Sequence, residues 1–419
     1  MSLIFDKNIL GTKENISVPF NESLSLPRIG SKSFEELARL YSISLPNFPS
    51  EAYRRAYRTF VSGSSIPWQK CMPKTKFDND FLQYSNSILE QVNFIENNIS
   101  FDYYKNTFLP NQEMFKYLEP CKIDKDKFDS KFELNTNHGL HALKTFKPQK
   151  NNFTSDVEYS TSSTLTGRLT VTSGPNILHL KKEYRDIICS RWGSEGTIFY
   201  LDFKSLEPRT ILLLNQLHAH NIDSYKGSLP LIKYCSKIPP DIYTHLITEL
   251  NLPSSVGRDE IKTTILALLY GATKESVVYK LKPMIESPED LVDLVVEYFG
   301  LDKLKSRLTQ MYVSNDRKFI TNFYGRPIFC EDTTPSTLVN YYIQSTAVDI
   351  SLYGYNKIIS RLVEKELLEW FVPLFSLHDA LILDVHNSVK HHINKLASLG
   401  QTIPGFSKEQ KFYLDVTIF

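Results

Sequence analysis

The sequence predicts an α+β protein with an antiparallel sheet, and three observations support this class. Apolar runs typical of strands lie far apart in the chain, at 197–201 and near the C-terminus. Long stretches in which apolar residues recur at helical spacing separate these runs. Two of the C-terminal runs are close neighbours in sequence, as in a hairpin. Strands separated by long helical insertions are typical of α+β folds.

In the first half of the chain, the spacing of apolar residues and the local composition predict the following elements in order. Residues 1–80 are rich in Ser, Pro and Asn and show weak periodicity. Residues 81–97 predict a helix, because apolar side chains recur there at intervals of three and four or their sums. Residues 146–166 predict a loop, since Lys, Asn, Ser and Thr dominate them. Residues 197–201 form an apolar run that predicts a strand.

The second half predicts two helices and three strands. Residues 257–270 predict a helix that ends at Gly271. Residues 341–363 predict a long helix with apolar residues on or near one face. The strands expected after it, of which the first two form a hairpin, are 370–377, 381–385 and 412–419.

Length and charge bound the possible functions. A chain of 419 residues is too long for one ordinary core, so two to four subdomains are expected. The 42% hydrophobic and 23% charged content is ordinary for a globular protein. Because the net charge is only +1, any nucleic-acid contact must come from local basic patches.

Cysteine usage and hydropathy predict a cytoplasmic protein. The five cysteines are widely scattered, and no CxxC pair occurs, which predicts free thiols and gives no zinc signature. The N-terminus lacks the basic and apolar regions of a signal peptide. No apolar run approaches 18 residues, so no membrane segment is expected.

Two aspartates are candidate metal ligands. Asp202 directly follows the strand expected at 197–201, and Asp379 lies between two apolar runs. Carboxylates are the ligands that Mg²⁺ prefers, and two of them can share two ions with substrate phosphates. Aspartates after strands are also common turn residues, so each one alone equally fits a plain turn.

The helix expected at 257–270 carries a stripe of functional side chains. Arg258, Lys262, Leu266 and Tyr270 are four residues apart, so each is displaced by only about 40° from the last. Arg and Lys, one turn apart, suit phosphate oxygens, and the Tyr ring suits a nucleobase. A surface helix with a solvated charge pair is the alternative for this segment alone.

Two further clusters suggest contacts with a nucleic acid. The first cluster is Thr166, Gly167 and Arg168, with Asn176 after it. Thr and Gly permit the backbone to approach a nucleic acid closely, and the Arg cation can contact a phosphate or a groove edge. Gln344, at the start of the long helix, suits the minor groove, whose acceptor pattern varies little with sequence. A plain turn and an ordinary amphipathic helix are the respective alternatives.

The order of these clusters resembles the family A DNA polymerases, the DNA polymerase I type. Motif A of that family, Asp-x4-Glu-x-Arg, is matched by Asp202, Glu207 and Arg209. Motif C, His-Asp-Glu, is matched by His378 and Asp379. The resemblance covers about residue 155 to the end. Motif B and the shorter family-like segments match at Arg258, Lys262, Tyr270, Gly271, Thr166–Arg168, Asp241–Thr244, Gly325–Arg326 and Gln344–Ala347.

The resemblance implies a role for each matched residue. Asp202 and Asp379, with the Phe203 carbonyl, would hold two Mg²⁺ ions, for which Mn²⁺ can substitute. Glu207 would exclude a ribose 2′-hydroxyl, and Tyr270 would stack near the templating base. The residues implied in dNTP binding are Arg258, Lys262, Leu266, Tyr270 and Glu207. Those implied in DNA binding are Arg168, Thr166, Asn176, Gln344, His378 and Arg209.

Three residues depart from the family pattern. Ala380 stands in place of the motif C glutamate and removes a third carboxylate. Leu266 stands where the family usually has Phe or Tyr, so sugar and base selectivity are expected to differ. Pro208 follows Glu207 and is expected to stiffen the backbone there. In addition, the segment before residue 155 is too short for the family's proofreading domain and lacks its acidic motif.

The resemblance implies a right-hand polymerase architecture without proofreading, of phage or plasmid type. Its expected parts are an N-terminal segment of unknown role (1–84), a reduced thumb (85–155), the first palm part (156–212), fingers with the motif B helix 257–271 (213–339), and the second palm part (340–419). Expected partners are primer-template DNA, dNTPs and a separate exonuclease or replication accessory protein.

Two alternatives remain at this stage. A single-subunit RNA polymerase shares the helix motif and the His-Asp motif, but Glu207 argues against it, because those enzymes lack this carboxylate. A catalytically inactive, polymerase-like DNA-binding subunit is the other. Retention of both aspartates and of Arg258 and Lys262 argues against that reading.

Overall fold

The computed structural model describes residues 2–20, 24–49, 51–58, 66–134, 140–220, 241–249, 252, 256–398 and 400–419. The chain divides into two compact units, Met1–Leu109 and Pro110–Phe419. The boundary expected at 84/85 falls inside a continuous helix, α5 (Lys74–Asn98). The boundary expected at 155/156 lies within the second unit.

The first unit packs short helices and a hairpin against α5. Strand β1 (Ser2–Phe5) pairs antiparallel with β2 (Ile16–Pro19). The helix expected at 81–97 is confirmed as the later part of α5. Apolar side chains from β1, α2 and α5 form one buried cluster. The other helices of this unit are α1 (Lys7–Leu10), α2 (Lys32–Leu40), α3 (Glu51–Arg58), α4 (Trp68–Cys71) and α6 (Phe101–Tyr103).

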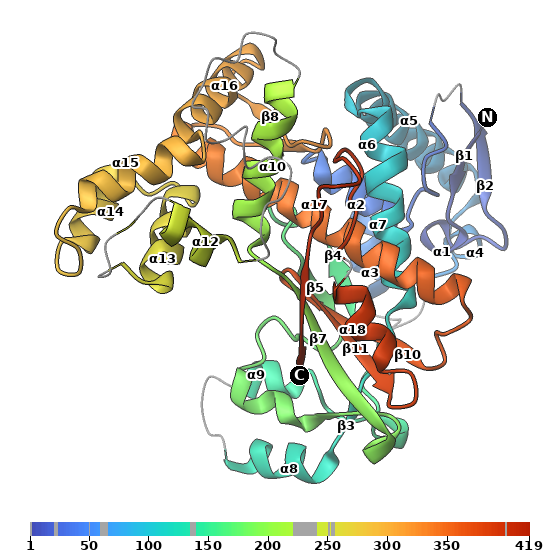
Figure 1. Ribbon diagram of the computed structural model, residues 1–419. Coiled ribbons are helices and arrows are strands. Elements are labelled where there is room, and N and C mark those ends of the chain that lie inside the picture. The colour runs from blue at the N-terminus through green and yellow to red at the C-terminus, as the bar shows by residue number, and fades with distance from the viewer. Residues whose placement is uncertain are drawn as a thin grey trace. The chain divides into compact units, whose positions relative to one another are not determined.

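A four-stranded antiparallel sheet lies at the centre of the second unit (Figure 1). Its strand order is β10-β11-β7-β12, and every neighbouring pair is antiparallel. The α+β class and the expected hairpin are therefore confirmed. The strands are β7 (Gly196–Phe203), β10 (Phe371–Leu377), β11 (Ala380–His386) and β12 (Leu414–Ile418).

Helix α17 (Pro335–Glu364) joins two of the three buried apolar clusters described in the second unit. It runs from the group formed by α12 to α16 across the sheet (Figure 1). Its first half contributes Ile343 to the core of that group, and its second half contributes Ile358 to the core over the sheet. The helix begins earlier than expected because the Thr334 side chain accepts from the Thr337 N–H.

The end of β7 lies directly against α17. A Cβ on Gly354 would stand 2.4 Å from Cζ of Phe203, so the glycine permits this close approach. Phe203 is buried in the core over the sheet. This packing fixes the strand end that carries Asp202.

The described helices between β7 and α17 are packed around one buried apolar cluster. Helix α13 confirms the helix expected at 257–270, and Gly271 follows it with φ +88°. The helices are α10 (Leu206–His220), α12 (Ile242–Glu249), α13 (Arg258–Leu269), α14 (Lys274–Leu281), α15 (Pro288–Tyr298) and α16 (Leu301–Ser314).

Short elements complete the second unit. Residues expected as a loop at 146–166 contain only a 3₁₀ turn and strand β4. The remaining helices are α7 (Leu109–Met114), α8 (Lys125–Leu134), α9 (Leu140–Lys144) and α18 (His391–Ser398). The short antiparallel pairs are β3 (Lys122–Ile123) with β6 (Ile188–Cys189), β4 (Glu158–Ser160) with β5 (Thr170–Ser173), and β8 (Phe319–Thr321) with β9 (Pro327–Phe329).

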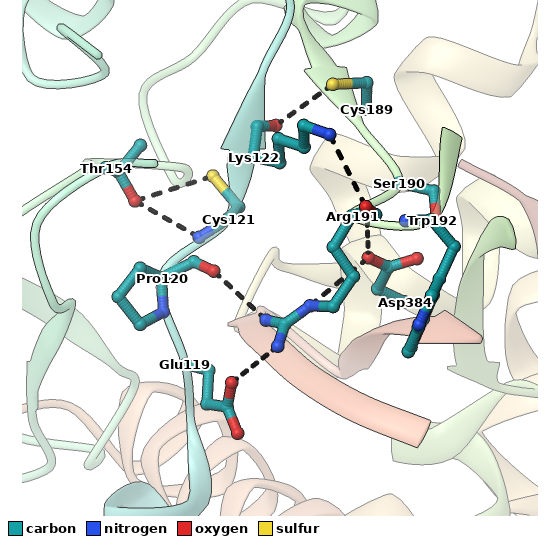
Figure 2. A network of polar contacts seen from close by, with 10 residues as sticks. All are labelled: Glu119, Pro120, Cys121, Lys122, Thr154, Cys189, Ser190, Arg191, Trp192 and Asp384. Atoms are coloured by element: carbon teal, nitrogen blue, oxygen red, sulfur yellow. Dashed lines mark hydrogen bonds and ion pairs between the residues drawn. The ribbon is translucent and has the colours of Figure 1, made fainter. Parts of the chain in front are cut away.

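Arg191 anchors the segment before β7 to the sheet (Figure 2). Its guanidinium donates to Glu119 at 2.7 Å and to the Pro120 carbonyl at 3.3 Å. Its backbone N–H donates to the Asp384 carboxylate on β11 at 2.8 Å. Asp384 is 1% exposed, and the Arg191 guanidinium, whose Nε lies 3.7 Å from its Oδ2, partly compensates this buried charge. The network attaches the segment before β7 to β11, away from the strand ends that carry Asp202 and Asp379.

Two expectations from composition concern the chain as a whole. The described cysteines, Cys71, Cys121, Cys189 and Cys330, are free thiols as expected, and Cys235 lies outside the described residues. Burial raises the pKa of Cys121 to about 12. In the described part of the chain, no helix combines the length and apolar character that crossing a bilayer requires.

Candidate active site

The sheet brings the two candidate aspartates to one edge. Asp202 on β7 pairs with Ala380, the first residue of β11. Asp379 occupies the turn between β10 and β11, and its carbonyl accepts from the Phe203 N–H at 3.2 Å. His378 beside it has φ +55°. The tight hairpin and the antiparallel register therefore place both carboxylates at the same strand ends.

The two carboxylates lie in an environment that disfavours two negative charges. Burial, and next the charge of Asp379, raise the pKa of Asp202, and burial also raises the pKa of Asp379. Asp202 Oδ1 is buried and has no hydrogen-bond partner within the described residues. An unsatisfied buried oxygen and two close acids are what a divalent cation with oxygen ligands would stabilise.

Protein ligands alone would not complete such a cation site. Over the described ranges, no group of three or more His, Cys, Asp and Glu side chains is arranged to hold a metal ion. Mg²⁺ is commonly bound by one or two carboxylates together with waters and substrate phosphates. The donor set therefore fits a cation that binds with a phosphorylated substrate.

A cavity of about 320 Å³ faces the aspartates. Helix α13 lines it with the expected stripe Arg258, Lys262 and Leu266, and Tyr270 follows at the end of that helix. Cations of α13 thus oppose the acids of the sheet across one space. The other lining residues are Phe203, Lys204, Ser205, Leu206, Glu207, Pro208, Asp241, Tyr243 and Asp415.

The two cations of the stripe differ in their surroundings. Arg258 Nε donates to Asp241 Oδ2 at 3.0 Å, and its guanidinium lies 5.2 Å from the centre of the Tyr243 ring. The Asp241 bond raises the pKa of Arg258. Lys262 is exposed and forms no ion pair with any described residue. Arg258 is therefore pre-oriented, whereas Lys262 is available to an anionic ligand.

Glu207 forms a polar contact at the boundary with a second cavity. It accepts from the Tyr270 hydroxyl at 2.7 Å, and Arg168 lies 3.6 Å from its other oxygen. Burial raises the pKa of Glu207, while these two partners oppose that rise. The second cavity, of about 310 Å³, is lined by Arg168, Leu169, Leu206, Glu207, Tyr270, Gln344, Ala347, Val348, Ser351, His378 and Asp379.

Three residues expected to contact DNA lie outside both cavities. Arg209 is 1% exposed, and its guanidinium packs 5.2 Å from the centre of the Tyr413 ring, so it is not available to a ligand in this structure. Burial lowers the pKa of Arg209 to about 10. Thr166 is buried. The Asn176 backbone N–H donates to Thr145 Oγ1 at 2.8 Å, and the Asn176 side chain contacts His179.

Sequence reasoning missed two residues of the first cavity. Asp415 on β12 stands opposite Asp202 in the strand register, and Lys204 Nζ lies 2.7 Å from its Oδ1. The alternation of apolar and polar residues at 412–419 predicted a strand, but it did not show that this strand pairs with β7. Only the register, which depends on the whole sheet, shows that this acid faces the cavity.

Comparisons with known proteins identify the fold. No model of a known protein family matches the chain, and no curated protein matches it. Solved structures do match, among them the POL domain of Pol1 from M. smegmatis, described in complex with DNA primer-template and dNTP. That likeness has a TM-score of 0.56 at 13% identity and covers 93% of this chain and 81% of the other. The chain therefore has the fold of a DNA polymerase domain.

Proposed function

We propose that the protein is a template-directed DNA polymerase that adds dNTPs to the 3′ end of a primer. The observation that carries this proposal is the first cavity, where Asp202 and Asp379 oppose Arg258 and Lys262. The polymerase-domain fold supports it, since the related structure was solved with primer-template and dNTP. Acids on one wall and cations on the other suit a cation-bound triphosphate.

Asp202 and Asp379, with the Phe203 carbonyl, would hold two Mg²⁺ or Mn²⁺ ions. When bound, such ions lower the pKa of the attacking hydroxyl and stabilise charge on the leaving phosphate. The unsatisfied Asp202 oxygen supports this assignment. The Phe203 N–H donates to the backbone carbonyl of Asp379. This bond keeps the Asp379 carboxylate at a fixed distance from that of Asp202.

Arg258 and Lys262 bind the triphosphate of the incoming nucleotide in this proposal. Asp241 accepts from Nε of Arg258, and Asp259 lies 4.0 Å from Nη1, beyond hydrogen-bond distance, so the terminal nitrogens can still donate to phosphate oxygens. Lys262 supplies a point charge one turn away. Both cations offset the negative charge that the substrate brings next to the acids.

The second cavity is assigned to the primer terminus. It shares Glu207, Tyr270 and Asp379 with the first cavity, as a growing end beside the incoming nucleotide requires. Arg168, Gln344 and His378 line it and are assigned to the primer-template duplex. Thr166 would then act through the loop that carries Arg168, whereas Asn176 lies beyond β5 and bonds to Thr145.

The right-hand architecture is part of the proposal. We assign 156–212 and 340–419 to the palm, because they supply the four-stranded sheet and both aspartates. Residues 213–339, which include α13, are assigned to the fingers. Residues 85–155 are assigned to a reduced thumb, and residues 1–84 have no assigned role.

Primer extension tests the proposal directly. Wild-type protein is incubated with primed DNA, Mg²⁺ and either dNTPs or rNTPs. Extension with dNTPs alone is the expected result. Preferred use of rNTPs would favour an RNA polymerase, and binding of the duplex without extension would favour an inactive polymerase-like subunit.

Glu207→Ala is expected to relax sugar selection. In the proposed pose the buried carboxylate fills the space that a 2′-hydroxyl needs, and its bond to Tyr270 holds it there. The ratio of kcat/KM for rNTP to kcat/KM for dNTP should rise by on the order of 10²-fold, an effect typical of removing a side chain that excludes one substituent of a substrate. Single-nucleotide incorporation with competing rNTP and dNTP measures this ratio. An unchanged ratio would remove Glu207 from sugar selection.

The protein is expected to leave a mismatched primer intact. Residues 1–155 contain no Asp-x-Glu motif of the kind that a proofreading site uses. Labelled mismatched primer is incubated with Mg²⁺ in the absence of dNTPs and pyrophosphate. Shortening that follows the protein through successive purification steps would overturn the expectation. In the absence of shortening, a separate exonuclease polypeptide is the expected source of any proofreading.

A further inference from the structure

We propose that Arg326 is a positioning residue for the DNA contact made by Arg168. Its guanidinium fastens the loop 161–168 to the turn between β8 and β9, which is itself bonded to α17. The inference rests on the proposed function, because it takes Arg168 as a ligand of the primer-template duplex. Arg326 lines neither cavity, so it acts through the loop and not on the substrate.

The first contact of Arg326 is with the start of the loop. Arg326 Nη2 donates to the Thr161 carbonyl. Both residues are buried, at 2% and 3% exposure. A charge-assisted bond in such surroundings is strong, because its loss would leave a buried donor and acceptor without each other.

The second contact is with the end of the loop, next to Arg168. Gly167 has φ +79°, and a Cβ built on it would stand 2.7 Å from Cζ of Arg326. The guanidinium therefore lies directly against the backbone at Gly167. A glycine suits this position on both counts, since it accepts the positive φ and leaves room for the guanidinium.

The turn that carries Arg326 is bonded to α17. Asn322 Oδ1 accepts from the Arg326 N–H at 3.0 Å, and Asn322 Nδ2 donates to Asp349 at 2.6 Å and to Ser345 at 3.1 Å. The Phe323 N–H donates to Thr346 Oγ1 at 3.3 Å. These acceptors lie in the part of α17 that directly follows Gln344. The turn thus has a fixed position relative to that residue.

A buried acid on α17 complements the charge of Arg326. Asp349 is 1% exposed, and burial raises its pKa to about 6, a shift that the Arg326 charge opposes. Removing Arg326 would leave Asp349 without this compensation. The buried cation and the buried acid therefore offset each other's charge in part, without a direct ion pair between them.

These contacts connect two elements that supply the second cavity. The loop carries Arg168, and α17 carries Gln344, and both residues line that cavity. With Arg326 in place, the distance between them is set by buried bonds. Without it, the loop keeps Arg168 but loses its fixed position relative to Gln344.

A double-mutant cycle on duplex affinity tests the proposal. The dissociation constant for primer-template is measured for wild type, Arg326→Met, Arg168→Ala and the double variant. We expect a loss of about 5-fold for Arg326→Met and about 10-fold for Arg168→Ala, with the double variant at about 10-fold, since residues that act through one contact are not additive. If Arg326 had a purely structural role, independent of Arg168, the double variant should lose affinity by the product of the two single losses, about 50-fold.

A matched control isolates the loop from general loosening of α17. Arg307 also contacts α17, where its guanidinium lies 5.7 Å from the centre of the Tyr342 ring, but it belongs to α16 and not to the turn between β8 and β9. Arg307→Met should leave duplex affinity unchanged. A loss equal to that of Arg326→Met would assign the effect to helix packing and overturn the proposal.

A second variant covers the case in which Arg326→Met does not fold. Gly167→Ala disturbs the same contact from the loop side and keeps the buried charges. It should weaken duplex affinity, again without adding to Arg168→Ala, and additivity here would also overturn the proposal. If wild type binds no duplex, or Arg168→Ala binds as well as wild type, the proposed function fails instead.

Discussion

Asp202→Asn and Asp379→Asn are each expected to lower the rate of primer extension by on the order of a thousandfold or more. Each change replaces a charged oxygen ligand by an amide of the same shape, so the site loses charge without losing volume. Rapid-quench single-nucleotide incorporation with saturating primer-template and dNTP measures the rate. A near wild-type rate in either variant would refute the site assignment.

The fold should survive both changes. The pKa of each aspartate is raised, so the pair destabilises the cation-free protein at neutral pH and is relieved as pH falls. Removing one charge should therefore not lower the thermal unfolding midpoint of the metal-free protein. Asp415→Asn is the matched control, since Asp415 lies opposite Asp202 but pairs with Lys204. It should cost far less activity than either aspartate of the pair.

Lys262→Ala is expected to separate nucleotide binding from duplex binding. The kcat/KM for dNTP should fall by on the order of 10²-fold. The variant lacks a positioned cation that would stabilise the negative charge that develops on the triphosphate in the transition state. Duplex affinity should stay near wild type. Lys262 forms no ion pair with any described residue, so its removal breaks none, although it removes a charge that lowers the pKa of Asp202. Stopped-flow incorporation and a fluorescence anisotropy titration measure the two quantities.

Arg168→Ala should show the opposite division. It should weaken duplex binding and lower the slope of log affinity against log salt by about one. Lys274→Ala serves as the control for charge alone, because Lys274 on α14 pairs with Asp293 outside both cavities. It should change neither quantity. Equal effects of Lys262→Ala and Arg168→Ala on duplex affinity would contradict the two-cavity assignment.

Local patterns predicted the elements that carry the candidate site. The apolar run at 197–201, the hairpin around Asp379 and the helix with Arg258 each depend on neighbouring residues, so periodicity was sufficient. The four-residue spacing also placed Arg258, Lys262 and Leu266 on one face, and all three line one cavity. That Asp202 and Asp379 meet required the strand pairing, which the resemblance supplied.

Contacts between distant segments could not be read from the sequence. Arg209 follows Glu207 by two residues, yet it packs on Tyr413 from the far end of the chain. Arg326 and Gly167 were noticed as separate segments, and only the fold joins them. The first unit was also missed, because its core combines residues spread over weakly periodic segments, such as Phe5, Phe34 and Phe77.

Templated incorporation of a single nucleotide shows directly whether the protein is a template-directed DNA polymerase. Four primed templates that differ only in the first unpaired base are each offered the four dNTPs separately, with Mg²⁺ and wild-type protein. We expect one-base extension with the complementary dNTP in each case, and none from Asp202→Asn under the same conditions. Extension that ignores the template base, or no extension of any template, would contradict it.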